Sequence, residues 1–324
     1  MGSVMEIAWS DRIGEGDWIR DRLVGSTILT VSSVVPDGFE AYARVLHPAR
    51  VAKGETEQNA RWAEVASWSD MELLPKAQFH SVALPPESSG SADLSLCRPP
   101  RRGSLTAEDC AALASLLRSH TTTADACWFC LWEGYAWEGL ESDPIPPEVL
   151  SGPKVLLARR DYVLYNGPIE AASAIDGVEA RSPNLWWPAD QAWCVASDID
   201  LPWTYVGGSS KLIEELLARD DLEVLPAGPA DTVWRIEKWI VKWVATGVEE
   251  LLRTGNCRIE TTRGVIEAWF ERPGLEPGTL GITSETDDGR RWGKRTRIEH
   301  RVEVELRRLL SLHLMMHLVD LVET

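Results

Sequence analysis

The run at residues 126–137, ACWFCLWEGYAW, constrains the fold more than any other part of the chain. Almost all of its side chains are apolar or aromatic, and it is short, so it predicts a strand buried in a core. The chain has 324 residues, of which 44% are hydrophobic, which is typical of a folded protein long enough for two domains.

Mixed elements surround this strand. Residues 27–31 and 39–46 flank Pro36-Asp37-Gly38, which predicts two strands joined by a tight turn. Residues 55–68 are expected to be helical, and Thr106 begins a second helix that runs to about His120. Further strands are predicted at residues 155–157, 162–165, 192–206 and 222–225, and a further helix at residues 210–219. The first part of the chain is therefore a mixed α/β domain.

A cluster of helix and strand breakers, Pro226-Ala227-Gly228-Pro229-Ala230, predicts the domain boundary. The charge balance changes at the same place. Residues 1–230 carry 34 acidic and 18 basic side chains, a balance of −16, whereas residues 231–324 carry 16 and 15, a balance of −1. We therefore expect one domain at residues 1–228 and another at residues 231–324.

The second domain is expected to contain two hairpins between two helices. Asp231 can cap a helix that ends at Gly255, and a last helix covers about residues 301–322. The hairpins span residues 257–271, with a turn at Arg263-Gly264, and residues 279–299, with a turn at Asp287-Asp288-Gly289. The order α-β-β-β-β-α implies a small antiparallel sheet, so the predicted class of the whole chain is α+β.

Composition and the N-terminal sequence indicate a cytoplasmic protein. The first ten residues do not resemble a signal peptide, and no apolar window is long enough to cross a membrane, so we expect no membrane partner. The six cysteines lie mostly in apolar segments, which is typical of reduced core thiols.

Three stretches carry a resemblance to a known family. They are VVPDGFEAY at residues 34–42, CWFCLWEG at residues 127–134, and SPNLWWP at residues 182–188 continuing to YVGGS at residues 205–209. Together they resemble an uncharacterised family of bacterial proteins over roughly residues 30–228. That family has no assigned activity, so the resemblance implies no catalytic residues.

The leading functional hypothesis is a binding surface in the first domain. Asp198 and Asp200 are two apart on a predicted strand, which would place both carboxylates on one face. Aromatic residues that dominate many protein interfaces surround them: Trp186, Trp187, Trp193, Trp203 and Tyr205. An acidic and aromatic surface suits a basic protein partner, so we expect a regulatory protein of the immunity or antitoxin type. The same negative charge disfavours nucleic acid as a partner of residues 1–230.

The alternative is an enzyme that uses magnesium. Gly207-Gly208-Ser209, a helix, and then Asp221 and Glu223 look like the signature of polymerase-β-like nucleotidyltransferases. Glycine amides at a helix start can hold phosphate, and alternate carboxylates on a strand can bind Mg²⁺ beside a nucleoside triphosphate. No third carboxylate is evident, and Ser209 can simply cap the helix. The leading hypothesis therefore requires neither catalytic residues nor a cofactor.

Two further groups of residues have metal-ligand spacing. Cys127 and Cys130 lie three apart in the apolar strand, where they face opposite sides, so we expect core packing. His313, His317 and Asp320 could share one face of the last helix, but that helix is apolar nearly all round, which favours structural histidines.

The second domain carries the one basic cluster of the sequence, at residues 290–301. Its members, with Trp292 among them, are Arg290, Arg291, Lys294, Arg295, Arg297 and Arg301. Such a cluster can bind the phosphates of nucleic acid, but alternate residues of a hairpin strand face opposite sides. Docking onto the acidic first domain is equally natural, so a solvated or intramolecular role is expected.

Overall fold

The computed structural model describes residues 7–24, 29–53, 56–83, 97–134, 145–157, 160–173, 182–233, 238–261, 264–271, 278–286, 291–298 and 314. The chain forms two compact units. Unit 1 comprises residues 1–26 and 30–233, and unit 2 comprises residues 27–29 and 234–324. The breaker cluster at residues 226–230 thus lies inside unit 1, and its first two residues belong to a strand.

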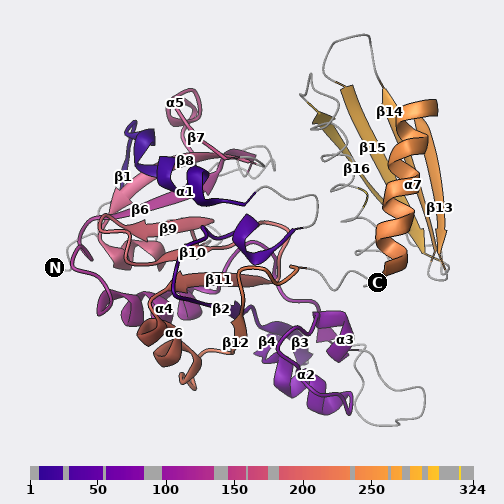
Figure 1. Cartoon of the computed structure of the whole chain (residues 1–324). Helices are drawn as coiled ribbons and strands as arrows, with labels where there is room; N and C mark the ends of the chain where they lie inside the picture. The colour runs from indigo at the N-terminus through magenta and orange to yellow at the C-terminus, as the bar shows by residue number, and fades with distance from the viewer. Residues whose placement is uncertain are drawn as a thin grey trace. The chain divides into compact units, whose positions relative to one another are not determined.

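An antiparallel sheet forms the centre of unit 1 (Figure 1). Its strands, in spatial order, are β1 (Ala8–Trp9), β8 (Asp161–Gly167), β6 (Cys127–Trp132), β9 (Leu185–Pro188), β10 (Cys194–Ala196), β11 (Trp203–Gly208), β2 (Ala41–Leu46) and β12 (Val224–Ala227). The short strand β7 (Val155–Leu156) also pairs with β8. The buried strand predicted within residues 126–137 is confirmed over residues 127–132 as β6, which pairs with β8 and β9.

Two amphipathic helices, α4 (Ala107–Arg118) and α6 (Ser210–Leu217), cover one face of this sheet (Figure 1). Each begins where the sequence places a capping residue. The hydroxyl of Thr106 accepts a hydrogen bond from Asp109 N at 3.0 Å, and that of Ser209 accepts one from Leu212 N at 3.2 Å. Both caps satisfy backbone N–H groups that a helix start leaves unpaired.

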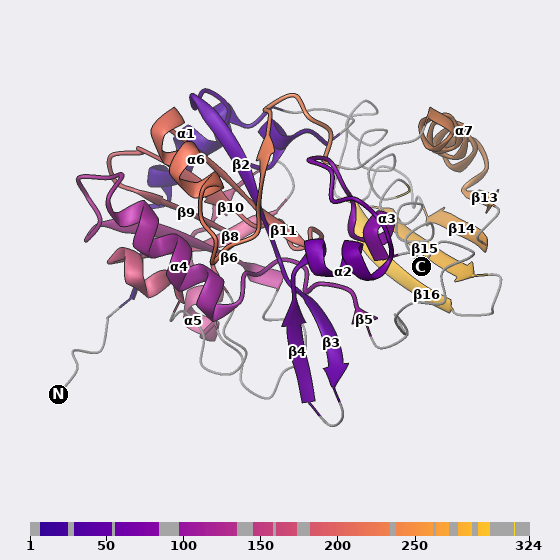
Figure 2. The same cartoon turned by 90° about the horizontal axis from the view of Figure 1, so that it is seen from below.

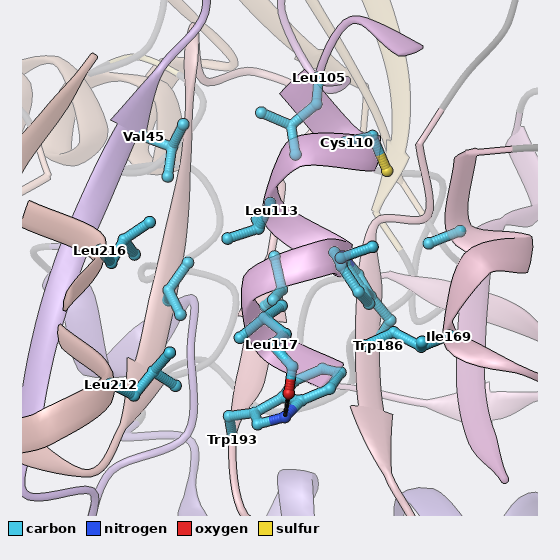
Figure 3. Packing of buried hydrophobic residues seen from close by; sticks show 14 of the residues in the cluster. Val45, Leu105, Cys110, Leu113, Leu117, Ile169, Trp186, Trp193, Leu212 and Leu216 are labelled. Atoms are coloured by element: carbon cyan, nitrogen blue, oxygen red, sulfur yellow. Dashed lines mark hydrogen bonds between the residues drawn. The ribbon is translucent and has the colours of Figure 1, made fainter. Parts of the chain in front are cut away.

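Leucines from the two helices interdigitate with strand residues to form the core (Figure 3). Leu113 and Leu117 of α4 pack with Leu212 and Leu216 of α6, and the ring of Trp193 closes one end of the cluster. The indole N–H of Trp193 donates to the carbonyl of Leu117 at 3.1 Å, which satisfies the polar atom of a fully buried side chain.

The opposite face of the sheet is also covered. Trp18 of α1 (Asp17–Arg22) meets Trp187 edge to face, with ring centroids 6.1 Å apart. Trp62 of α2 (Trp62–Trp68) meets Trp203 in the same way at 6.2 Å. The sheet therefore buries aromatic side chains on both sides.

A smaller sheet of three strands lies beside α2 and α3 (Phe79–Ala83), as Figure 2 shows. Its order is β4 (Thr56–Ala60), β3 (Ala49–Lys53) and β5 (Cys97–Arg98). The helix predicted at residues 55–68 is therefore wrong in its first half. Strand pairing with β3 takes residues 56–60, and the helix begins only at Trp62.

The remaining short elements of unit 1 are single helical turns. They are η1 (Ile13–Gly16), η2 (Val31–Ser33), α5 (Pro147–Leu150) and η5 (Ile169–Ser173). The turn η2 replaces part of the strand predicted at residues 27–31. The backbone N–H of Thr30 donates to the hydroxyl of Ser33 at 3.0 Å, which stabilises a tight turn over an extended strand.

Unit 2 matches its predicted order through the two hairpins. Helix α7 (Lys238–Thr254) precedes β13 (Asn256–Thr261), β14 (Gly264–Glu271), β15 (Gly278–Thr286) and β16 (Arg291–Ile298), which pair in sequence order. Of the last predicted helix, the described residues include only Leu314, which is helical and buried. Asp231 does not cap α7, because its carboxylate accepts from Gly228 N at 2.8 Å and pairs with Lys76.

Removing the side chain of Leu113 tests the packing between α4 and the sheet. Leu113 is fully buried, so Leu113→Ala should lower the free energy of unfolding by about 2–5 kcal/mol, since a cavity replaces a packed side chain. The matched control is Leu217→Ala on α6, where the side chain is 38% exposed and the expected change is about 0.5 kcal/mol. Denaturant unfolding measures both, and equal changes would contradict the packing described.

Candidate functional site

The aromatic residues predicted to form a binding surface lie in the core instead. Their relative exposures are 0% for Trp186, Trp193 and Trp203, 1% for Trp187 and 2% for Tyr205. The expectation of an exposed aromatic surface at these positions is therefore wrong. The physical reason is that both faces of the sheet are covered. Side chains that alternate along a strand therefore enter one buried layer or the other, and neither group is exposed.

Asp198 and Asp200 do come together, but on an arginine. Both lie in the connection between β10 and β11, outside the strands. The Nη2 group of Arg160 donates to Asp198 Oδ1 at 3.1 Å and also to Asp200 Oδ2. The side chains of Arg160, Asp198 and Asp200 are only 12%, 8% and 18% exposed, respectively. The two carboxylates are thus engaged internally.

The surroundings of Arg160 keep it charged. Its guanidinium lies over the ring of Trp132, 5.4 Å from the centroid. Burial alone would lower the pKa of Arg160, but Asp198 and Asp200 more than offset this and hold the pKa above its usual range. Arg160 directly precedes β8, so the ion cluster ties the start of that strand to the β10–β11 connection.

A second polar chain begins in the same connection and was missed from the sequence. His47 Nδ1 lies 2.7 Å from the carbonyl oxygen of Arg101, which can only accept, so Nδ1 carries the proton. In the neutral ring, Nε2 then accepts from the hydroxyl of Thr204 at 2.9 Å, and Ser197 donates to Thr204 at 2.6 Å. Burial lowers the pKa of His47 to about 4, consistent with this neutral tautomer.

This His–Thr–Ser chain holds structure together and offers no nucleophile to a substrate. His47, Thr204 and Ser197 are 1%, 0% and 1% exposed, and the accepting nitrogen of the histidine is already bonded. Asn184 extends the network, because its Nδ2 donates to the Ser197 carbonyl at 3.1 Å and its Oδ1 accepts from Trp132 N at 2.8 Å. No local sequence spacing predicts this network, since His47 and Thr204 are 157 residues apart.

Arg44 is a further buried charge near the predicted residues. It is 4% exposed, lies 5.0 Å from the centroid of the Trp203 ring, and donates to the Ala77 carbonyl at 2.7 Å. Burial lowers the pKa of Arg44, and Tyr205 and Asp231 act in the opposite direction. Burial also raises the pKa of Tyr205 to about 12. The aromatic layer thus surrounds a cation inside unit 1.

The nucleotidyltransferase arrangement is not formed. Gly207 pairs with Tyr42 near the end of β11, whereas the carbonyl of Glu223 accepts from Leu46, which pairs with Trp203 at the start of β11. Four residues of strand separate the two places, or about 13 Å. The prediction of a site that combines Gly207, Gly208 and Ser209 with Asp221 and Glu223 is therefore wrong.

Each of the two carboxylates has another partner. Glu223 accepts from Trp62 N at 2.6 Å and from Ala63 N at 2.8 Å, so it caps the start of α2. Asp221 pairs with Arg219, its Oδ1 accepting from Arg219 Nε at 2.6 Å. The space next to Gly207 is filled by the Phe39 ring, so the glycine allows close packing of that ring.

The proposed metal ligands do not assemble within the described residues. Cys127 and Cys130 are both buried in β6, and burial raises the pKa of each thiol. Across the described parts of the chain, no group of three His, Cys, Asp or Glu side chains could hold a metal ion. His313, His317 and Asp320 lie outside the described residues.

Acidic side chains gather where α2, α4 and the α6–β12 loop meet. We call this group the acidic cluster; its members are Glu64, Glu108, Asp109, Asp220, Asp221 and Glu223. Arg61 connects the segments, because its side chain donates to the carbonyl of Asp220 and its N–H donates to Glu64 at 2.7 Å. The charge of Arg61 also acts on Asp109, Asp221 and Glu223, and Arg219 pairs with Asp221.

Charges from different segments act on one another within this cluster. Burial raises the pKa of Asp109, and the charges of Glu108 and Asp221 raise it further, while Arg61 lowers it. Burial likewise raises the pKa of Glu223, with Glu64 adding to the effect. Negative charge is therefore in excess at this place, and an added cation would relieve the repulsion.

Comparison with known proteins identifies no relative: no family model, curated protein or solved structure matches this chain. The resemblance of the three stretches to a bacterial family thus stays a prediction. Among the described helices, none combines the length and apolar character that a membrane crossing requires.

Replacing Asp198 and Asp200 together by Asn tests the ion cluster. The double variant leaves the Arg160 charge buried without a carboxylate, so the free energy of unfolding should fall by about 3–5 kcal/mol. A matched control is Asp21→Asn with Asp125→Asn, since those side chains are 71% and 84% exposed. Thermal melts compare the two, and an unchanged melt in the first variant would show that the cluster is not structural.

Acid should destabilise unit 1 through His47. The folded pKa, about 4, lies below the ordinary value of 6.5, so the unfolded chain binds the proton more readily and stability falls as pH drops from 6.5 toward 4. The slope attributable to this group is about 1.4 kcal/mol per pH unit. Denaturant unfolding at several pH values should show a shallower slope for His47→Gln, and equal slopes would refute the neutral buried ring.

Proposed function

We propose that unit 1 is a binding module for a basic protein, and that the acidic cluster is its contact surface. The observation that carries the proposal is the excess of carboxylates around Arg61, where Glu108 and Asp221 raise the pKa of Asp109. A partner that brings Lys or Arg side chains would lower this repulsion and gain paired contacts. The surface expected from Asp198 and Asp200 is thus replaced by one formed from other acidic residues.

An exposed apolar side chain adjoins the cluster. Leu217, the last residue of α6, is 38% exposed and lies two residues before Arg219. A charged rim around an apolar contact is common at protein interfaces, where charge guides association and the apolar centre excludes water. This combination favours a folded basic partner over a metal ion.

The proposal includes a regulatory role in the cytoplasm. A protein of the immunity or antitoxin kind works by covering a surface of its target, which requires complementary charge and no catalytic group of its own. All six cysteines are free thiols, which supports a reducing compartment. The surplus of 34 acidic over 18 basic residues in residues 1–230 would speed association with a cationic target.

The test removes charge from the cluster without removing a helix cap. Glu108→Gln with Asp220→Asn should weaken binding of a short peptide rich in Lys and Arg by about five- to tenfold, since each exposed pair contributes modestly. Asp21→Asn with Asp125→Asn removes the same charge from exposed positions elsewhere. Fluorescence anisotropy of the labelled peptide at low ionic strength measures all three proteins.

The control distinguishes a site from general negative charge. Binding that weakens equally in both double variants would mean that only net charge matters, and the cluster would lose its assignment. A wild-type chain that does not bind the peptide at low ionic strength would also overturn the proposal.

A further inference from the structure

The small sheet of unit 1, with strands β4, β3 and β5, has one packed face and one face that reaches solvent (Figure 2). Ala49, Ala60 and Cys97 point to the packed side, where they meet Val65 of α2. Residues at the alternate positions point the other way, because successive side chains of a strand face opposite sides. We call this second side the arginine face; it carries Arg50, Glu57, Asn59 and Arg98.

Three side chains that can donate hydrogen bonds form a row across the arginine face. Arg50 of β3 lies opposite Asn59 of β4 on one side and opposite Arg98 of β5 on the other. Neighbouring strands are about 4.8 Å apart, so the three side chains leave the sheet next to one another. The row therefore presents two guanidinium groups and one amide to the same space.

One carboxylate serves both arginines of the row. Glu57 Oε2 lies 3.5 Å from Arg50 Nη1, and Glu57 Oε1 lies 2.9 Å from Arg98 Nη1. Within the described residues no other carboxylate pairs with either arginine, and Arg50 Nε has no hydrogen-bond partner there. Like charges directly opposite each other on neighbouring strands are destabilising. One positive charge thus remains uncompensated, and an added anion would stabilise the face.

A ligand can reach these groups from solvent. The side chains of Arg98, Arg50 and Glu57 are 63%, 41% and 39% exposed, respectively. The arginine face also differs from the other ion pairs of unit 1, since Arg20 and Arg118 each have two carboxylates of their own. Positive charge is therefore in local excess at Arg50 and Arg98.

We propose that the arginine face binds the phosphate group of a small molecule. The phosphate takes the place of the Glu57 carboxylate between the two guanidinium groups, and the Asn59 amide donates a further hydrogen bond. A phosphate monoester carries a charge of about −1.5 to −2 at neutral pH, which matches two arginines, and its oxygens suit the fork of guanidinium donors. A carboxylate ligand would only repeat the single charge that Glu57 already supplies.

The charge of the surrounding domain favours a small ligand over nucleic acid. Residues 1–230 carry a balance of −16, from 34 acidic and 18 basic side chains. That field repels a long polyanion, whose binding depends on many phosphate contacts, but it opposes a single phosphate group much less.

The experiment is calorimetric titration of the full chain at low ionic strength with inorganic phosphate and with phenyl phosphate, which separate free phosphate from an organic ester. Arg50→Ala with Arg98→Ala should weaken binding at least about tenfold, because both charged donors are lost. Glu57→Gln should strengthen it about threefold, because the competing carboxylate is removed while the size of the side chain is kept. Asn59→Ala should weaken it only about twofold, since its amide is uncharged.

The matched control is Arg20→Ala with Arg118→Ala, which removes two arginines that are 51% and 46% exposed and have their own carboxylates. It should change the affinity by less than about twofold. The proposal is overturned by equal weakening in this control, by an unchanged or lower affinity of Glu57→Gln, by acetate binding as tightly as phosphate, or by no binding of either probe. Thermal melts of every variant check that the fold is retained, and the probe that binds more tightly identifies the source of the phosphate.

Discussion

Burial of both faces of the central sheet is the constraint on which unit 1 depends. Each strand between β8 and β2 places side chains alternately into two apolar layers, so both layers need a cover. Helices α4 and α6 supply one cover through their leucines, and α1 and α2 supply part of the other through Trp18 and Trp62. Several tryptophans of unit 1 are buried in these two layers, among them Trp62, Trp187, Trp193 and Trp203.

Burying a polar group in such a core is unfavourable unless the group forms hydrogen bonds, and the buried polar groups of unit 1 form them in pairs and chains. Arg160 donates hydrogen bonds to the carboxylates of Asp198 and Asp200. The ring of His47 is hydrogen-bonded to a backbone carbonyl and to the hydroxyl of Thr204. Both groups act on the same stretch, the connection between β10 and β11. A turn that would otherwise be free to vary is thereby fixed from two sides, which accounts for residues that look functional in sequence but are engaged internally.

Local sequence signals predict the elements whose structure is decided locally. The pairing of the consecutive strands β13 and β14, the cap at Thr106 and the apolar run of β6 each depend on neighbouring residues. Pairing between distant segments decides the rest. Residues 56–60 become a strand because β3 lies beside them, and Asp198 meets an arginine 38 residues away. Alternation along a strand gives two faces but does not indicate that both are buried, which is why the aromatic surface was misplaced.

The distribution of charge differs between the two units. Within the described part of unit 1, Asp198 and Asp200 pair with Arg160, and the guanidinium of Arg44 lies over the Trp203 ring. Residues 231–324 are almost balanced in charge, and among the described residues of unit 2 Arg258 pairs with Glu260 and Glu267, and Arg291 pairs with Glu285. At the acidic cluster the local excess is negative, and this is the basis for proposing a cationic partner there. Because charges farther apart than about 8–10 Å are screened at physiological salt, each site responds mainly to its own surroundings.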